Sequence, residues 1–161
     1  QWNVGEGELR LKVGGGVDTR LGFLYNMRNS NNPAQAYAQV NIAPNAVAAY
    51  RFRLRKIPFQ LRYEVQVPLL GLTFSPNYGQ SYYEIFTRDN YDHNLVVTSP
   101  VSAPSLRQLL TLDFTVRHTT FRVGYLGDYQ QAKINQLRQH VWSNLLVLGI
   151  VRKFSINKFI P

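Results

Sequence analysis

Cysteine is absent from the 161 residues of this chain, which excludes disulfide bridges and thiolate metal sites. Long apolar runs are absent as well. The longest, Leu145–Val151, has seven residues, whereas a membrane-spanning helix needs roughly 20. If the chain enters a bilayer, it therefore does so as β-strands. A signal segment is also lacking at Gln1, and we expect that an exported protein of this sequence has already lost it.

Aromatic residues are plentiful at 13%, in line with β-strands and with the aromatic girdles of membrane barrels. The segment that starts at Ile57 shows the clearest pattern, because its side chains alternate between apolar and polar with a period of two. The apolar set is Ile57, Phe59, Leu61, Tyr63, Val65, Val67 and Leu69, and the polar set is Gln60, Arg62, Glu64 and Gln66. This pattern predicts a strand with one apolar and one polar face.

The same alternation extends this strand to about Phe74 and predicts five others, in residues 9–27, 36–54, 106–117, 121–130 and 137–156. Gly14, Gly15 and Gly16 indicate a bulge or a bend in the first, and Pro44 is expected to kink or end the second. The last strand is apolar on both faces over Leu145–Val151, so its inward and outward sides stay unassigned.

Short and long connections alternate along the chain. Arg55–Lys56 and His118 are short turns, whereas 26–33, 75–104 and 131–136 are longer, so all short turns lie at one end of the sheet. This polarity is typical of outer-membrane barrels. We predict an all-β fold, an antiparallel up-and-down transmembrane β-barrel in one domain over 1–161, with 75–104 as a long extracellular loop. A soluble barrel is the alternative, but its outer face should be polar.

The number of strands is open, because about six are readable and bacterial barrels start at about eight. Gly5–Gly7 is interpreted as another short turn, which makes Gln1–Val4 the end of an earlier strand. The chain would then be the C-terminal part of a longer barrel whose first strands are missing. Alternatively, long strands split at Gly15 or Pro44, which would raise the count to eight.

Charged residues on the polar strand faces are predicted to line the lumen as a network. Its members are Arg10, Arg20, Arg51, Arg53, Arg62, Glu64, Arg107, Asp113, Arg117 and Arg122. The net charge of +9 would also suit nucleic-acid binding, but these arginines recur at alternate positions among carboxylates instead of forming a run. We expect no nucleic-acid partner. Because an unpaired buried guanidinium is costly, the excess of arginine indicates water or an anion in the lumen.

The 75–104 loop holds the candidate contact residues, since exposed aromatic clusters favour partner proteins. They are Tyr78, Tyr82, Tyr83, Tyr91 and His93. A lipid-modifying enzyme would need a hydroxyl such as Ser99 beside His93, which spacing does not establish. No histidine pair has metal-ligand spacing, and the glycines at 14–16 lack the helix and lysine of a phosphate loop. We expect no catalytic residue, no metal and no cofactor.

Five segments carry a family resemblance, namely Gly22–Asn26, Asn32–Ala36, Ala48–Leu54, Phe74–Phe86 and Ser105–Leu110. They resemble an uncharacterised family of Bacteroidota envelope proteins, and the likeness spans nearly the whole chain. The resemblance implies a small outer-membrane barrel with a leader peptide and additional residues at the N-terminus. It implies no activity.

We expect an integral protein of the bacterial outer membrane with a structural, scaffolding or accessory-subunit role in an envelope complex. Its expected partners are outer-membrane lipid and, through the 75–104 loop, another outer-membrane protein. The alternatives are a narrow pore or binding protein for small anionic solutes or lipids, a lipid-modifying outer-membrane enzyme, and a soluble lipid-binding barrel.

Overall fold

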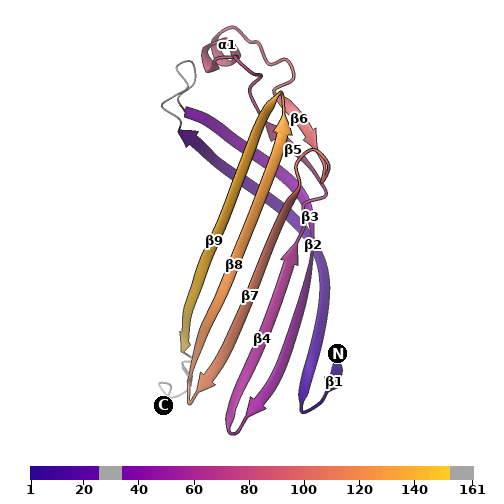
Figure 1. The fold of residues 1–161 in the computed structure, drawn as a ribbon, viewed down its shortest axis with the longest axis vertical. Helices are drawn as coiled ribbons and strands as arrows, with labels where there is room; N and C mark the ends of the chain where they lie inside the picture. Colours follow the sequence, from indigo (N-terminus) through magenta and orange to yellow (C-terminus); the bar gives the residue numbers. More distant parts are fainter. Residues whose placement is uncertain (26–33, 153–161) are drawn as a thin grey trace, which may run out of the picture.

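The computed structural model describes residues 1–25 and 34–152, which form one antiparallel sheet with a short helix beyond one end (Figure 1). The strands are β1 (Trp2–Val4), β2 (Gly7–Tyr25), β3 (Ala34–Leu54), β4 (Ile57–Gln66), β5 (Leu70–Phe74), β6 (Leu95–Thr98), β7 (Ser105–Val116), β8 (Thr119–Ile134) and β9 (Leu137–Arg152), and the helix is α1 (Tyr82–Thr87). The predicted all-β antiparallel class is confirmed. Over the described ranges, no helix has the length and apolar character required to cross a membrane.

Neighbouring strands follow the order β1-β2-β3-β4-β7-β8-β9, and each pair is antiparallel. β5 pairs with β3 beyond the end of β4, and β6 pairs with β5. The sheet is not closed. Among the described residues, no strand pairs with the outer edge of β9, and β2 is paired on the β1 side only over Gly7–Leu9.

Two predicted segments are divided differently in the structure. The strand expected over 57–74 breaks at 67–69 into β4 and β5, although backbone hydrogen bonds from Val67 and Leu69 to β3 continue across the break. The 75–104 segment is not one loop, because it contains α1 and the strand β6. The sequence did not reveal β6, since four residues are too few for a clear alternation.

β2 and β3 run without interruption for 19 and 21 residues. Their register is unbroken through Gly14, Gly15 and Gly16, and Pro44 lies opposite Gly15. The predicted bulge is therefore absent, and Pro44 does not end its strand. Both strands bend midway (Figure 1), so the structure shows the predicted bend and kink, which were the alternatives to a bulge and a strand end. A run of glycines permits this bend without removing a residue from the ladder.

The turns define two ends of the sheet. We call the end that carries the tight turns Gly5–Glu6, Arg55–Lys56 and Arg117–His118 the turn end, and the opposite end, which carries α1, the loop end (Figure 1). The three turns lie at one end, as expected. The predicted long connection over 131–136 is wrong, because β8 and β9 are joined at the loop end by a tight turn alone. The expected loop 26–33 and the expected end of the last strand near Ile156 lie outside the described residues.

That tight turn consists of Asn135 and Gln136, both in the left-handed region with φ of 51° and 63°. Two-residue turns with two left-handed positions match the twist of a hairpin, and asparagine is favoured in them. The polar composition of 131–136 therefore belongs to a hairpin that continues as paired strands, not to an irregular loop.

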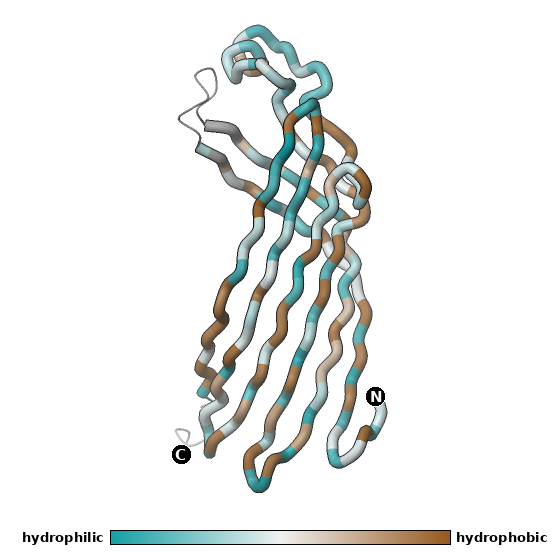
Figure 2. The backbone as a smooth tube through the Cα atoms, in the orientation of Figure 1, coloured by the Kyte–Doolittle hydropathy of each residue, from teal (hydrophilic) through white to brown (hydrophobic). Residues whose placement is uncertain are grey.

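The burial of side chains is inverted relative to a soluble fold. Among the described residues, four apolar residues are buried, against eight polar or charged ones. Large apolar side chains are exposed instead, including Val13, Leu21 and Leu146 at 88%, 78% and 72%. We call the side of the sheet that bears these three residues the apolar face, and the other side the polar face. Figure 2 shows the resulting alternation of hydrophobic and hydrophilic residues along the strands.

Aromatic rings border the apolar face. An aromatic row near the turn end consists of Tyr50, Phe52, Phe59, Phe114 and Phe121. Its neighbouring ring centroids are 5.4 to 6.0 Å apart, because the register pairs the phenylalanines of adjacent strands directly. Farther along β8 and β9, Tyr129 and Trp142 meet edge to face at 6.0 Å.

Candidate functional site

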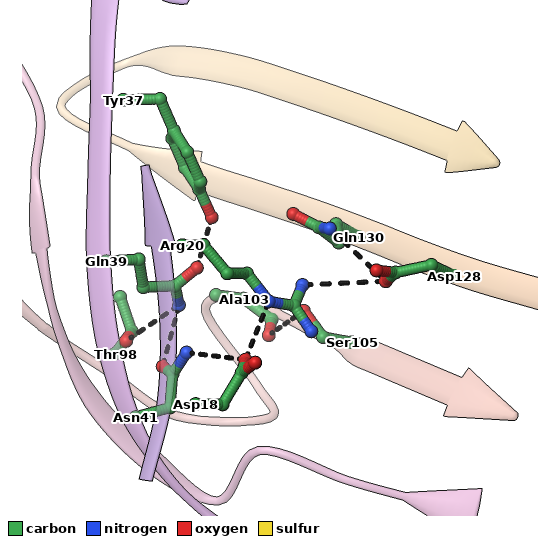
Figure 3. Close-up of polar contacts among 10 residues, drawn as sticks. All are labelled: Asp18, Arg20, Tyr37, Gln39, Asn41, Thr98, Ala103, Ser105, Asp128 and Gln130. Atoms are coloured by element: carbon green, nitrogen blue, oxygen red, sulfur yellow. Dashed lines mark hydrogen bonds and ion pairs between the residues drawn. The ribbon is translucent and has the colours of Figure 1, made fainter. Parts of the chain in front are cut away.

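A network of side chains on the polar face connects distant strands, and we call it the polar bridge (Figure 3). Its members are Asp18 and Arg20 from β2, Tyr37, Gln39 and Asn41 from β3, Thr98 from β6, and Asp128 and Gln130 from β8. Alternation along each strand places these side chains on one face, because every second residue points to the same side.

Arg20 is the centre of the polar bridge. Its Nε donates a hydrogen bond to Asp18 Oδ2 at 2.6 Å, and its Nη1 lies 3.7 Å from Asp128 Oδ1. The side chains of Arg20 and Asp18 are only 10% and 9% exposed. β2 and β8 are four positions apart in the sheet order, so a flat sheet would separate them by about 19 Å. The ion pair to Asp128 therefore requires the sheet to curl around its polar face.

Uncharged side chains complete the polar bridge on β3. Gln39 Nε2 donates to Asn41 Oδ1 at 2.8 Å and to Thr98 Oγ1 at 3.5 Å. Asn41 Nδ2 in turn donates to Asp18 Oδ2 at 3.4 Å, and the Tyr37 hydroxyl donates to Gln39 Oε1. These buried amides thus find partners inside the network, as burial requires.

The polar bridge places one guanidinium between two carboxylates. Nη1 and Nη2 of Arg20 have no hydrogen-bond partner among the described residues, and the 3.7 Å ion pair is the remaining contact of Nη1. Because Asp18 and Asp128 already outweigh its charge, this position does not suit an anionic ligand. Its geometry suits a cross-strand tie instead.

Nearer the turn end, the predicted charged residues come together mainly in pairs. The pairs are Arg122 with Asp113, Arg62 with Glu64, and Arg10 with Glu8. Arg122 is held most firmly, because its Nε and Nη2 donate to the two oxygens of Asp113 at 2.6 Å each. Such bidentate pairs are among the stronger charge-assisted contacts.

Four other arginines of the predicted network are less constrained. Arg51 Nε donates to Gln60 Oε1 at 2.8 Å, and Arg51 and Arg53 line a hollow of about 870 Å³ at the turn end. Arg53 and Arg107 pair with no carboxylate among the described residues. Arg117 lies in the β7–β8 turn and is exposed, so it does not belong to the polar face, contrary to the prediction.

The segment between β5 and β6 is tied to two sides of the loop end. Asn135 Nδ2, in the β8–β9 turn, donates to the carbonyls of Ser75 and His93 at 3.0 and 2.9 Å. On the other side, the backbone N–H of Ala36 in β3 donates to the Tyr82 hydroxyl. A pocket of about 260 Å³ lies between these ties and is lined by residues of β3, β5, β8 and β9.

Within this segment, α1 starts with a capping box. The Ser81 hydroxyl accepts from the Glu84 N–H, and the Ser81 N–H donates to the Glu84 carboxylate at 2.8 Å. That backbone hydrogen bond lowers the pKa of Glu84. Phe86 stacks on Tyr82 and on Phe74, with centroids 6.0 and 6.4 Å apart, which attaches α1 to β5.

The predicted loop contacts fall into two groups. Tyr78, Tyr83 and Tyr91 are exposed at 75%, 60% and 53%, and the Arg88 guanidinium lies over the Tyr83 ring at 5.7 Å. Tyr82 is half-buried and serves as a tie to β3. Three of the four tyrosines therefore remain available to a partner.

His93 does not form a catalytic arrangement. Its Nδ1 lies 2.6 Å from Asp92, and both side chains are 77% exposed. Among the described residues no hydroxyl is hydrogen-bonded to the His93 ring, and the Ser99 N–H instead donates to Ser102 Oγ. Nor do three His, Cys, Asp or Glu side chains cluster as metal ligands in the described ranges.

Sequence reasoning missed how the polar bridge is assembled. Alternation in the strand predicted over 36–54 puts Gln39 and Asn41 on its polar face, but nothing in the chain indicates their partners. Thr98 gave no signal, because it lies in the segment read as a loop. Asn135 carried a signal, since asparagine is favoured in tight hairpin turns.

A comparison with protein families gives one match. The family model described as "Protein of unknown function (DUF3316)" matches residues 1–159. The chain belongs to this family. No curated protein and no solved structure matches the chain. The expected membership of an uncharacterised family is thereby confirmed, and the family description supplies no activity.

Replacing Arg20 by alanine tests the polar bridge. Arg20→Ala leaves the buried carboxylate of Asp18 without its hydrogen-bonded cation, so we expect a loss of about 3–5 kcal/mol in the free energy of unfolding. Arg10→Ala is the matched control on the same strand and face, and its more exposed pair with Glu8 should cost less than about 1 kcal/mol. Guanidinium unfolding in detergent measures both, and equal losses would contradict a bridging role for Arg20.

Proposed function

We propose that this protein is an integral β-barrel of the bacterial outer membrane with a structural, scaffolding or accessory-subunit role in an envelope complex. The observation that carries the proposal is the inverted burial, since apolar side chains are exposed and polar ones are buried. Extended apolar surface is unfavourable in water and suits hydrocarbon. A strand-built protein spans a membrane as a closed barrel, because an open edge would leave backbone groups unpaired in hydrocarbon.

The height of the apolar face supports a membrane setting. Phe121 of the aromatic row and Tyr129 are eight residues apart on β8, which corresponds to roughly 26 Å of strand. With a tilt of about 40°, the band between them is about 20 Å high, near the value of about 25 Å for outer-membrane barrels. Two amide side chains, Asn144 and Gln108, lie on this part of the face, and both accept hydrogen bonds from tyrosine hydroxyls. Tyr125 and Tyr129 donate to Asn144, and Tyr63 donates to Gln108.

Strand direction supports closure by further strands. β1 and β9 both run antiparallel to their neighbours β2 and β8, and alternation along the sheet makes β1 and β9 parallel to each other. An antiparallel barrel therefore needs an odd number of strands between them. One such strand, together with an extension of β1 along the unpaired part of β2, gives about eight.

A narrow barrel agrees with the polar bridge. In a ring of eight, β2 and β8 would stand opposite each other, four positions apart in either direction. Barrels of about eight strands have interiors that side chains just fill. The Arg20–Asp128 pair would then cross the interior, which favours a structural role over an open pore for anions. A lipid-modifying activity has no comparable support, because no hydroxyl of residues 1–25 or 34–152 is hydrogen-bonded to the His93 ring.

The loop end supports a role in a complex. Tyr78, Tyr83, Phe86 and Tyr91 are all more than half exposed there, and large aromatic side chains are favoured contact residues. The ties from Asn135 and the stacking of α1 hold these rings in place, which reduces the entropy lost on binding. We propose another outer-membrane protein as the partner of this surface.

Charge substitutions on the two faces test the membrane setting. Leu110→Arg should cost about 2–4 kcal/mol, because Leu110 pairs with Tyr125, halfway along the band, and the guanidinium would face hydrocarbon near the bilayer midplane. Leu61→Arg and Leu112→Arg should cost less, because both residues lie closer to the aromatic row. Gln60→Arg is the matched control, and it should be tolerated because Gln60 lies on the polar face opposite Asp113. Unfolding from lipid vesicles measures the difference. Similar costs on both faces would remove the assignment of the apolar face to lipid.

Electrophoretic mobility tests closure. The protein extracted from native membranes should migrate faster before heating than after boiling, because a closed barrel stays folded in mild detergent. The boiled sample of the same preparation is the control. Identical migration of the two samples would count against a closed barrel while leaving the sheet itself unaffected.

A further inference from the structure

Two hairpins at the turn end repeat the same eight-residue pattern. Phe52–Phe59 reads FRLRKIPF and Phe114–Phe121 reads FTVRHTTF. In each, the two phenylalanines are direct cross-strand partners, with ring centroids 5.5 and 5.4 Å apart. The third residue after the first phenylalanine is an arginine of the turn, followed by a second basic or titratable residue. The hairpins therefore present the same combination of rings and cation.

The turn arginines occupy a backbone conformation that does not favour them. Arg55 and Arg117 have φ of 57° and 56°, in the left-handed region. The third turn of this end has Gly5 at the corresponding position, with φ of 59°. Hairpin turns with a positive φ at the first central residue normally use glycine there. Arginine thus weakens the turn, and a side chain retained at a strained position calls for a function.

The surroundings of these arginines indicate their ligand. Arg55, Lys56 and Arg117 are exposed, and among the described residues they pair with no carboxylate. They lie just beyond the aromatic row, on the side away from the apolar band. Aromatic belts lie at the level of lipid headgroups, so cations immediately outside such a belt meet the phosphate layer.

The charge at the two ends differs. At the loop end, cations and carboxylates of the described residues balance, with Arg88, Lys133 and Arg138 against Glu84, Asp89 and Asp92. At the turn end, the cations among the described residues, Arg53, Arg55, Lys56, Arg117 and Arg152, outnumber the carboxylates Glu6, Glu8 and Asp113. Glu8 and Asp113 are in addition already paired with Arg10 and Arg122. The turn end is therefore the basic end of the molecule.

We propose that the Arg55–Lys56 and Arg117–His118 turns form a binding site for the headgroup phosphates of anionic phospholipids in the leaflet that the turn end faces. The site rests on the proposed membrane location and adds to it a lipid class and an orientation. Each turn cation attracts anionic lipid, and the phenylalanine pair above it fixes the depth at which the phosphate is met.

The test compares phospholipids that share acyl chains. The purified full-length protein in neutral detergent is titrated with short-chain phosphatidylglycerol, with the matching phosphatidylcholine, and with inorganic phosphate. We expect tighter binding of phosphatidylglycerol than of the other two. Arg55→Gly with Arg117→Gly should reduce this affinity about 25-fold, since each surface cation contributes roughly fivefold, and should leave the turns at least as stable because glycine suits their backbone.

Lys133→Gln with Arg138→Gln is the matched control, because it removes two exposed cations at the loop end. It should keep the preference for phosphatidylglycerol. Equal binding of both lipids by the unsubstituted protein, or an unchanged preference in the glycine variant, would overturn the proposal, as would equal affinity for free phosphate. Flotation with pure phosphatidylcholine vesicles separates the two proposals, because a protein that fails to insert there refutes the membrane location itself.

Discussion

The structure depends on one constraint, which is that each strand has two chemically different faces and needs a separate environment for each. Along β4, Leu61 and Tyr63 point to one side while Arg62 and Glu64 point to the other. A single layer of such strands has no apolar core of its own, and the few buried apolar residues agree with this. Curling the layer turns the polar side chains toward one another and leaves the apolar ones on the outer side, where the proposed membrane location would place hydrocarbon.

The polar bridge belongs to the polar face of the sheet, and the aromatic row belongs to the apolar face. Arg20 reaches Asp128 on a strand four positions away, so charged groups of the concave side satisfy one another across it. On the convex side, Phe52, Phe59 and their neighbours form a continuous band of rings. In the proposed barrel this band marks the border of the bilayer, and the basic turns beyond it give the molecule its orientation.

Much of this arrangement could be predicted from the sequence, because a period of two is a strong signal over long strands. The faces of β2, β3, β4, β7 and most of β8 follow directly from it. The prediction failed at Gln131–Gln136, where strands that extend beyond the apolar band no longer alternate. It also left Leu145–Val151 of β9 unassigned, because both faces of the strand are apolar there. The register settles that case, since Leu146 and Leu148 pair with Tyr125 and Val123 of the apolar face.

The candidate site could be predicted only in part. The alternation of apolar and polar residues identified Arg20, Arg62 and Arg122 as polar-face residues. It contains no information on which strands approach each other across a curled sheet. The Arg20–Asp128 contact joins residues more than a hundred positions apart, and it depends on curvature that no local pattern encodes. Alternation along the strands likewise did not reveal the repeat of phenylalanine pairs and turn arginines. The repeat points to a function only because Arg55 and Arg117 adopt a left-handed backbone conformation, which the sequence does not show.

The central claim is that the apolar face meets lipid, and β9 provides the most direct test. Because the chain has no cysteine, single cysteines at Leu146, Val147 and Leu148 can carry an environment-sensitive fluorophore. In vesicles, a lipid-borne quencher should act at positions 146 and 148 and spare 147. Quenching by an aqueous quencher at all three positions, or equal lipid quenching at all three, would contradict the account.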